Sequence, residues 1–157
     1  MVWEAEDQDY DVQNQSFYDS IFGQRFNSAG ETVEGEFLIS TRLAGSYYDD
    51  SDPAVAGLDG GGFAVAWKSY QYGSSYDVFA RVFGDEGDAI GGEFRVNDFR
   101  SYSYTYQEDV AVSGLSDGGF VVVWKSEEQG IIDYNNEVFG RRFDVFGDTV
   151  GDEFQVD

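Results

Sequence analysis

Two stretches of this sequence align without a gap: Asp52-Pro-Ala-Val-Ala-Gly-Leu-Asp-Gly-Gly-Gly-Phe-Ala-Val-Ala-Trp-Lys-Ser69 and Asp109-Val-Ala-Val-Ser-Gly-Leu-Ser-Asp-Gly-Gly-Phe-Val-Val-Val-Trp-Lys-Ser126. Equivalent residues in the two stretches are 57 positions apart. Each stretch has two short apolar runs around a glycine-rich turn, and glycine readily takes the positive φ that a tight β-hairpin needs. The match therefore predicts copies of one all-β repeat of about 57 residues.

A second motif occurs three times, as Ile21-Phe-Gly-Gln-Arg-Phe26, Val78-Phe-Ala-Arg-Val-Phe83 and Val138-Phe-Gly-Arg-Arg-Phe143. Each copy is followed by a glycine suited to a left-handed turn position and then by Glu-Phe. The equivalent glycines are Gly30, Gly87 and Gly147, and the equivalent glutamates are Glu36, Glu93 and Glu153. We expect a single domain, residues 1–157, that contains a partial repeat at 1–40 and further repeats at 41–97 and 98–157.

Each full repeat is predicted to form four antiparallel strands, near residues 54–58, 62–69, 78–83 and 89–96 in the first full copy. Side chains alternate along the third strand, with Phe79, Arg81 and Phe83 on one face and Ala80 and Val82 on the other. The apolar run at 120–124 predicts a strand that is buried on both faces. Four strands in such a repeat resemble a propeller blade, and an open stack or sandwich of sheets is the alternative architecture. The incomplete first repeat predicts an exposed sheet edge, which a neighbouring subunit could complete by adding strands.

The composition limits the classes of function. The chain has 31 acidic and 9 basic residues, a net charge of −22, and 18% aromatic residues. The aromatic content argues for a folded protein, while the charge disfavours binding to nucleic acid and to anionic membranes. The absence of Cys and His excludes thiolate and imidazole chemistry. No segment has the apolar character of a signal peptide or a membrane-spanning helix, so we expect any export signal to lie elsewhere.

The repeat resembles tandem repeats of large secreted bacterial proteins that are described as RTX-like, hemolysin-type calcium-binding or surface-adhesin proteins. The resemblance is carried by Asp117-Gly-Gly-Phe-Val-Val-Val-Trp124, by Val138-Phe-Gly-Arg-Arg-Phe-Asp144 and by Gly151-Asp-Glu-Phe-Gln-Val156. It implies an exported protein of a marine or aquatic bacterium, located outside the cell or on its surface, with a role in adhesion, matrix or calcium binding. The loops that follow the two tryptophan strands depart from the family, because neither is a calcium nonapeptide or an EF-hand loop.

Acidic clusters make calcium the one cofactor that we consider, because calcium takes six to eight oxygen ligands. Two clusters are the candidate metal sites, and a third set of acidic residues, Glu127, Glu128 and Asp133, shares one loop. A solvated acidic surface explains the same residues without any metal. The candidate metal ligands are Asp7, Asp9, Asp11, Asp49, Asp50 and Asp52.

The tyrosines are predicted to form the binding surface. All eleven fall outside the repeated apolar runs, in segments that we predict to be long loops, whereas the phenylalanines mostly occupy strands. Tyrosine offers a large amphipathic contact area at a low entropic cost, so we expect these loops to bind a glycan or a protein. Alternatively, the rings cover the sheet ends or pack between subunits. The candidate binding residues are Tyr47, Tyr48, Tyr70, Tyr72, Tyr76, Tyr102, Tyr104 and Tyr106.

Three functions compete on these observations. The first is a non-catalytic extracellular module that adheres through its acidic, tyrosine-rich loops. The second is a structural subunit that assembles with itself, or with neighbouring repeats, into a closed oligomer or a filament. The third, a glycosidase-like enzyme, is disfavoured because the acidic residues recur in each copy, whereas an active site is a unique constellation. The recurring pairs Arg81 with Glu93 and Arg141 with Glu153 are instead predicted to be cross-strand ion pairs.

Overall fold

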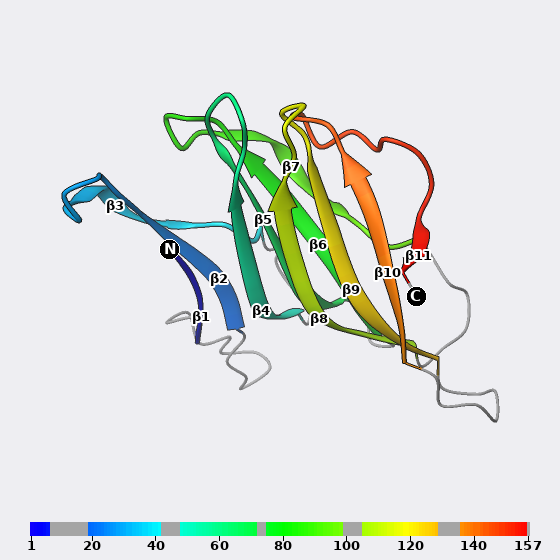
Figure 1. Cartoon of the computed structure of the whole chain (residues 1–157). Helices are drawn as coiled ribbons and strands as arrows, with labels where there is room; N and C mark the ends of the chain where they lie inside the picture. Colours follow the sequence, from blue (N-terminus) through cyan, green and yellow to red (C-terminus); the bar gives the residue numbers. More distant parts are fainter. Residues whose placement is uncertain (7–18, 42–47, 72–74, 99–104, 129–135, 157) are drawn as a thin grey trace.

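The computed structural model describes residues 1–6, 19–41, 48–71, 75–98, 105–128 and 136–156. The described residues form eleven strands in three antiparallel sheets and no helix, which confirms the all-β prediction (Figure 1). None of these residues therefore belongs to a helix that could cross a membrane. The strands are β1 (Val2–Glu6), β2 (Asp19–Phe26), β3 (Thr32–Leu38), β4 (Tyr48–Gly57), β5 (Phe63–Gln71), β6 (Ser75–Phe83), β7 (Ala89–Arg95), β8 (Thr105–Gly114), β9 (Phe120–Glu128), β10 (Asn136–Phe143) and β11 (Phe154–Val156).

Each sheet is a meander, in which strands that are consecutive in the sequence lie side by side. We call β1-β2-β3 the N-terminal sheet, β4-β5-β6-β7 the central sheet and β8-β9-β10-β11 the C-terminal sheet. Pairing in the two four-stranded sheets follows the same register, since Trp67 lies opposite Phe79 in one and Trp124 lies opposite Phe139 in the other. Glycines at positive φ close the hairpins as the sequence predicts, for example Gly87 and Gly147, both at 88°.

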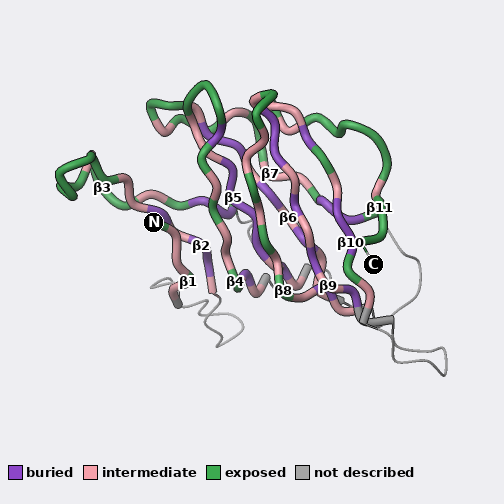
Figure 2. Tube along the Cα trace, viewed as in Figure 1, coloured by how far each residue is buried: buried purple, intermediate pink, exposed green. Residues whose placement is uncertain are grey.

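The central sheet lies between the other two and is covered on both faces. Ala80 and Val82 of β6 belong to the apolar cluster that joins the central and C-terminal sheets. Phe79 and Phe83 of the same strand belong to the cluster that joins the central and N-terminal sheets. The predicted alternation along this strand is therefore confirmed, and buried positions follow the strands in Figure 2 while exposed positions gather at the turns.

The prediction for the apolar run at 120–124 was wrong. Trp124 and Val122 are buried against the central sheet, but Val121 and Val123 are only partly buried. The reason is that these two valines point to the side of the C-terminal sheet that no other described sheet covers. In β5, the equivalent run is buried on both faces, because the central sheet has a neighbour on each side.

The placement of the tyrosines outside strands was also wrong at several positions. β4 and β8 begin earlier than predicted, because each passes through an irregularity in register at an aspartate with positive φ, Asp52 at 53° and Asp109 at 51°. Such a bulge lets a strand extend to both sides of an irregular residue, so the strand begins before the start that the sequence predicts. As a result Tyr48 and Tyr106 belong to strands, and because β5 ends later and β6 begins earlier than predicted, Tyr70 and Tyr76 do as well.

Candidate functional site

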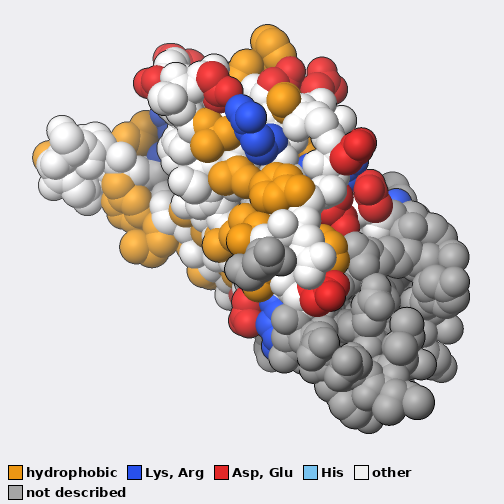
Figure 3. Space-filling model, turned by 45° about the vertical axis from the view of Figure 1, so that its right-hand side comes forward, with side chains coloured by type: hydrophobic (Ala, Val, Ile, Leu, Met, Phe, Trp, Pro, Cys, Tyr) orange, Lys and Arg blue, Asp and Glu red, His pale blue; other side chains and the backbone are white. Residues whose placement is uncertain are grey.

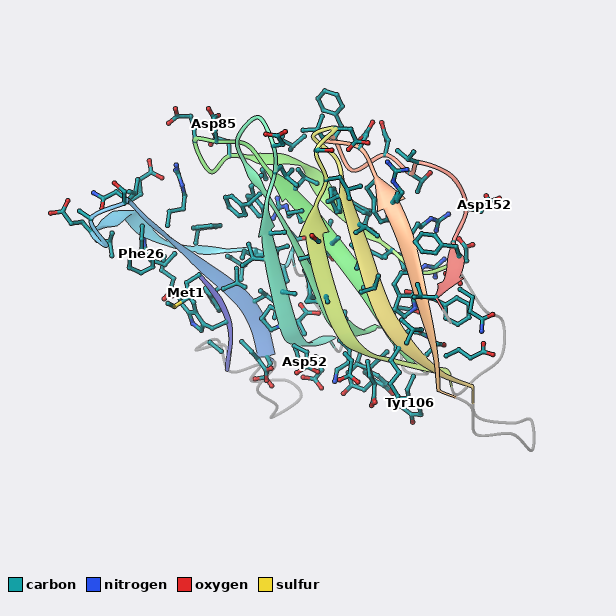
Figure 4. All side chains as sticks on the ribbon, viewed as in Figure 1. Met1, Phe26, Asp52, Asp85, Tyr106 and Asp152 are labelled. Carbon is teal, nitrogen blue, oxygen red and sulfur yellow. The ribbon has the colours of Figure 1, made fainter. Side chains whose placement is uncertain are left out.

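Three of the predicted binding residues come together at one end of the sheets. Tyr70 at the end of β5 lies opposite Tyr76 of β6, with ring centroids 5.2 Å apart. The ring of Tyr106 in β8 lies 6.3 Å from that of Tyr76, so the group bridges the central and C-terminal sheets. Asp52 and Tyr106 are labelled at this same end in Figure 4. We call Tyr70, Tyr76 and Tyr106 the tyrosine cluster.

Charged side chains surround Tyr76 at the centre of the cluster. Its hydroxyl donates a hydrogen bond to Asp49 Oδ2 at 2.7 Å. The ammonium group of Lys68 lies 4.9 Å from the ring centroid and pairs with Asp52 at 2.8 Å. Burial raises the pKa of Tyr76 and the hydrogen bond to Asp49 raises it further, so this phenol stays neutral and keeps its proton as a donor. The cluster thus combines apolar ring faces with carboxylates and one cation.

Asp50 lies beside this cluster in the sequence but points into the protein. Its side chain is 3% exposed and accepts a hydrogen bond from the Ser69 hydroxyl. Burial raises the pKa of Asp50 to about 6, and the negative charge of Glu93 adds to the rise, while hydrogen bonds from Ser69 and Ser40 oppose it. Asp50 is therefore part of the packing between the N-terminal and central sheets.

The predicted metal cluster at 49–52 is divided among different partners. Asp49 accepts from Tyr76, Asp50 is buried with Ser69, and Asp52 pairs with Lys68. Within the described ranges, no three acidic side chains are grouped in a way that could hold a metal ion. Asp7, Asp9 and Asp11 lie outside the described residues, so calcium binding there stays a prediction.

The remaining predicted binding residues are distributed as follows. Tyr48 belongs to β4 but its side chain is outside the described part of the structure, and Tyr47, Tyr72, Tyr102 and Tyr104 also lie outside it. The sequence interpretation missed Lys68, the cation over the Tyr76 ring. A signal was available, because a lysine follows the tryptophan in both aligned stretches, and Lys125 likewise pairs with an acidic residue of the neighbouring strand, Glu108, at 3.5 Å.

The predicted cross-strand ion pairs are replaced by contacts between sheets. Arg81 donates to the carbonyl oxygen of Ile39 at 2.9 Å, and Glu93 accepts from the backbone N–H of Thr41 at 2.7 Å. Arg141 and Glu153 repeat this arrangement one sheet further along. Arg141 donates to the Val96 carbonyl at 3.0 Å, and Glu153 accepts from the Asp98 N–H at 3.0 Å. These residues fasten each sheet to its neighbour.

A cleft with a volume of about 650 Å³ opens between β3 and the turn that joins β6 to β7. Arg25 and Arg81 line it together with four carboxylates, those of Glu34, Glu36, Glu86 and Asp88. Arg25 donates to the carbonyl oxygens of Glu86 and, at 2.7 Å, of Asp85, so it ties the N-terminal sheet to this turn. The cleft is therefore a gap in the packing between the N-terminal and central sheets, and the Arg25 side chain spans this gap.

Comparisons with family models, with curated proteins and with solved structures find no significant match to this chain. The resemblance to RTX-like and adhesin repeats therefore rests on the sequence motifs alone.

Proposed function

We propose that the chain is a non-catalytic β-repeat module of an exported bacterial protein, which acts in adhesion outside the cell or on its surface. In this proposal each sheet is one blade-like unit of a tandem array, and the sheet ends that carry the tyrosines form the binding surface. The motifs that resemble adhesin repeats support the exported location.

The tyrosine cluster carries this proposal. Tyr70, Tyr76 and Tyr106 are half-buried, so they are held in place by packing while part of each ring remains accessible. Fixed aromatic rings give contact area without a large loss of side-chain entropy on binding. The contact of Lys68 with the Tyr76 ring supports a preference of these rings for cationic groups. Ligands that fit this chemistry are glycans, whose hydroxyls would donate to Asp49 and Asp52, and basic segments of surface proteins.

Binding of the purified chain to cells or to matrix-coated surfaces tests the proposal. Replacing Tyr70 and Tyr106 together by serine should weaken binding by about tenfold or more, because aromatic residues at the centre of an interface dominate its affinity. Phe146→Ser is the matched control, since Phe146 is a highly exposed aromatic residue at a hairpin tip away from the cluster. Unchanged binding by a folded double variant would refute the proposal.

Calcium is tested in the same assay. Binding that is lost in a chelator and restored by millimolar calcium would assign metal sites to the acidic segments. Binding that is indifferent to the chelator would leave the acidic residues as a solvated surface and as direct ligands of the partner.

A further inference from the structure

Neighbouring sheets pack through the same two kinds of face at both internal interfaces. One face, which we call the aromatic face, carries the tryptophan and phenylalanines of a sheet, and the opposite face, which we call the small face, carries mainly alanine, valine, isoleucine and glycine. The small face of the N-terminal sheet covers the aromatic face of the central sheet, and the small face of the central sheet covers the aromatic face of the C-terminal sheet. The aromatic faces consist of Phe63, Trp67, Phe79 and Phe83 in the central sheet and of Phe120, Trp124, Phe139 and Phe143 in the C-terminal sheet.

One pair of phenylalanines recurs at each interface. Phe37 of β3 packs on Phe83 at the end of β6, with ring centroids 5.7 Å apart. One sheet further along, Phe94 of β7 packs on Phe143 at the end of β10 at 5.2 Å. In each pair, a phenylalanine from the last strand of one sheet meets the phenylalanine that ends the repeated six-residue motif of the next sheet. The chain holds one more residue of each kind, Phe154 and Phe26.

The small face of the C-terminal sheet is uncovered among the described residues. Phe154 lies over Gly140, where an added Cβ would meet the Phe154 ring at 2.8 Å, as Phe37 lies over Gly23 in the N-terminal sheet. Phe154 is nevertheless 42% exposed, and Val138 is 39% exposed whereas its central-sheet equivalent Val78 is fully buried. Figure 3 shows hydrophobic side chains gathered in the middle of the surface that is turned forward, with acidic side chains around them.

The aromatic face of the N-terminal sheet is likewise covered by no other sheet in the described part of the chain. Phe26 is 46% exposed, whereas its equivalents Phe83 and Phe143 are almost fully buried. Phe22, which lies opposite Trp3 in the sheet, is also only partly buried. The two ends of the stack thus present the two halves of the interface that the chain builds twice within itself.

We propose that a second copy of this chain covers these faces in a head-to-tail contact, in which the small face of one C-terminal sheet packs on the aromatic face of the next N-terminal sheet. Phe154 of one copy then meets Phe26 of the other, as Phe94 meets Phe143 within the chain. The charged residues fit the same scheme. Arg142 is equivalent to Arg25, which donates to backbone carbonyl oxygens of the neighbouring hairpin. The Arg142 guanidinium is half-exposed, and among the described residues its ion-pair partner is the exposed Asp117.

The contact uses different faces on the two copies, so it repeats. A heterologous contact of this kind gives a ring if the rotation between copies closes and a filament if it does not. Each copy carries a net charge of −22, so like charges oppose association at long range. We therefore expect association to strengthen as added salt screens this repulsion. This inference is independent of ligand binding at the tyrosine cluster.

Single substitutions on either face test the proposal by light scattering. The wild-type chain at high concentration and moderate salt should have a mass of two or more copies of 17.5 kDa. Phe154→Glu and Phe26→Glu should each reduce the mass to one copy, because a buried unpaired carboxylate opposes the contact. Phe146→Glu is the control that adds the same charge to an exposed phenylalanine outside both faces, and it should assemble as the wild type does.

Mixing the two single variants identifies the faces that meet. Each variant keeps one intact face, so an equal mixture should form dimers with one contact and nothing larger. A contact between two identical faces would behave differently, since only one of the two variants would lose it and mixing would restore nothing. A wild-type chain that stays a single copy at high salt, or a mixture that stays monomeric, would overturn the proposal.

Discussion

The central sheet forms one interface with the N-terminal sheet and a second interface with the C-terminal sheet. The two interfaces differ most at one buried polar position. In the first, Asp50 lies in the interface, and the Ser40 hydroxyl accepts a hydrogen bond from the Ile21 N–H at 3.1 Å. In the second, the equivalent of Asp50 is Gln107, which is 2% exposed, and Asn97 accepts from the Val78 N–H at 2.8 Å. The positions are the same, but among the described residues only the first interface buries a group that titrates.

The difference indicates which features of the packing are fixed and which vary. Both interfaces keep the stacked phenylalanines, Phe63 on Phe83 at 4.9 Å and Phe120 on Phe143 at 5.1 Å. The first interface, however, adds a buried carboxyl group and a cleft that Arg25 crosses, so its packing is less complete. We expect the N-terminal sheet to be the part of the chain that detaches first from the stack.

Truncation of the equivalent phenylalanines should have the largest effect and should separate the interfaces. Phe143→Ala removes a buried ring that contacts both Phe94 and Phe120, so it should lower the free energy of unfolding by about 4 kcal/mol. Phe83→Ala should cost less, about 3 kcal/mol, because Phe83 already borders the open cleft. Urea unfolding of both variants measures the difference. Equal losses would mean that the two interfaces are packed equally well.

The buried carboxyl group should make stability depend on pH. The pKa of Asp50 is about 6 in the folded chain and 3.8 in the reference state, so the folded state binds the proton more tightly. Protonated Asp50 therefore contributes fully to the free energy of unfolding below the unfolded pKa. This contribution is lost as the pH rises from about 4 to about 6, and the loss approaches about 3 kcal/mol. Asp50→Asn should match the wild type near pH 4 and exceed its stability increasingly above that pH, as urea unfolding at several pH values would reveal.

The control for this experiment is Asp52→Asn. Asp52 is exposed and pairs with Lys68 on the surface, so its replacement should change the free energy of unfolding by less than about 1 kcal/mol. An Asp50→Asn variant whose stability differs from the wild type by the same amount at every pH would contradict the assignment of the buried charge to Asp50.

Much of the strand arrangement could be predicted from the sequence, but the contacts between sheets could not. Glycine position and apolar alternation are local signals, and the turns at Gly87 and Gly147 follow them. The sequence predicts a cross-strand pair between Arg81 and Glu93, because they occupy matching positions on neighbouring strands. Their partners in the structure are the Ile39 carbonyl and the Thr41 N–H. Both are backbone groups outside the central sheet, and a pattern of side chains in the sequence cannot predict such contacts.

The same limit applies to the candidate site. The abundance of tyrosine predicted a binding surface, yet it could not specify that Tyr70, Tyr76 and Tyr106 would meet. Their approach depends on the bulge at Asp109, which extends β8 to include Tyr106, and a bulge at a non-glycine residue is weakly encoded in the sequence. The sequence also groups Asp50 with Asp49 and Asp52, because it does not predict that β4 includes these residues. Within a strand, neighbouring side chains point to opposite faces, so Asp50 and Asp49 are separated.

The smallest effect expected concerns a backbone position that again sets the N-terminal sheet apart. Glu34 has φ 64°, whereas its equivalents Gly91 and Gly151 take positive φ of 76° and 83° as glycines. Glu34→Gly should therefore raise the free energy of unfolding by about 1 kcal/mol, because glycine takes this conformation without the clash of a Cβ atom. The ion pair with Arg25 is a small loss, because its distance is 3.8 Å and the Glu34 side chain is 75% exposed. Glu34→Ala removes the same charge but keeps the strained conformation, so urea unfolding should detect no gain in the free energy of unfolding. An equal gain in both variants would mean that the loss of a negative charge, and not the relief of backbone strain, stabilises the sheet.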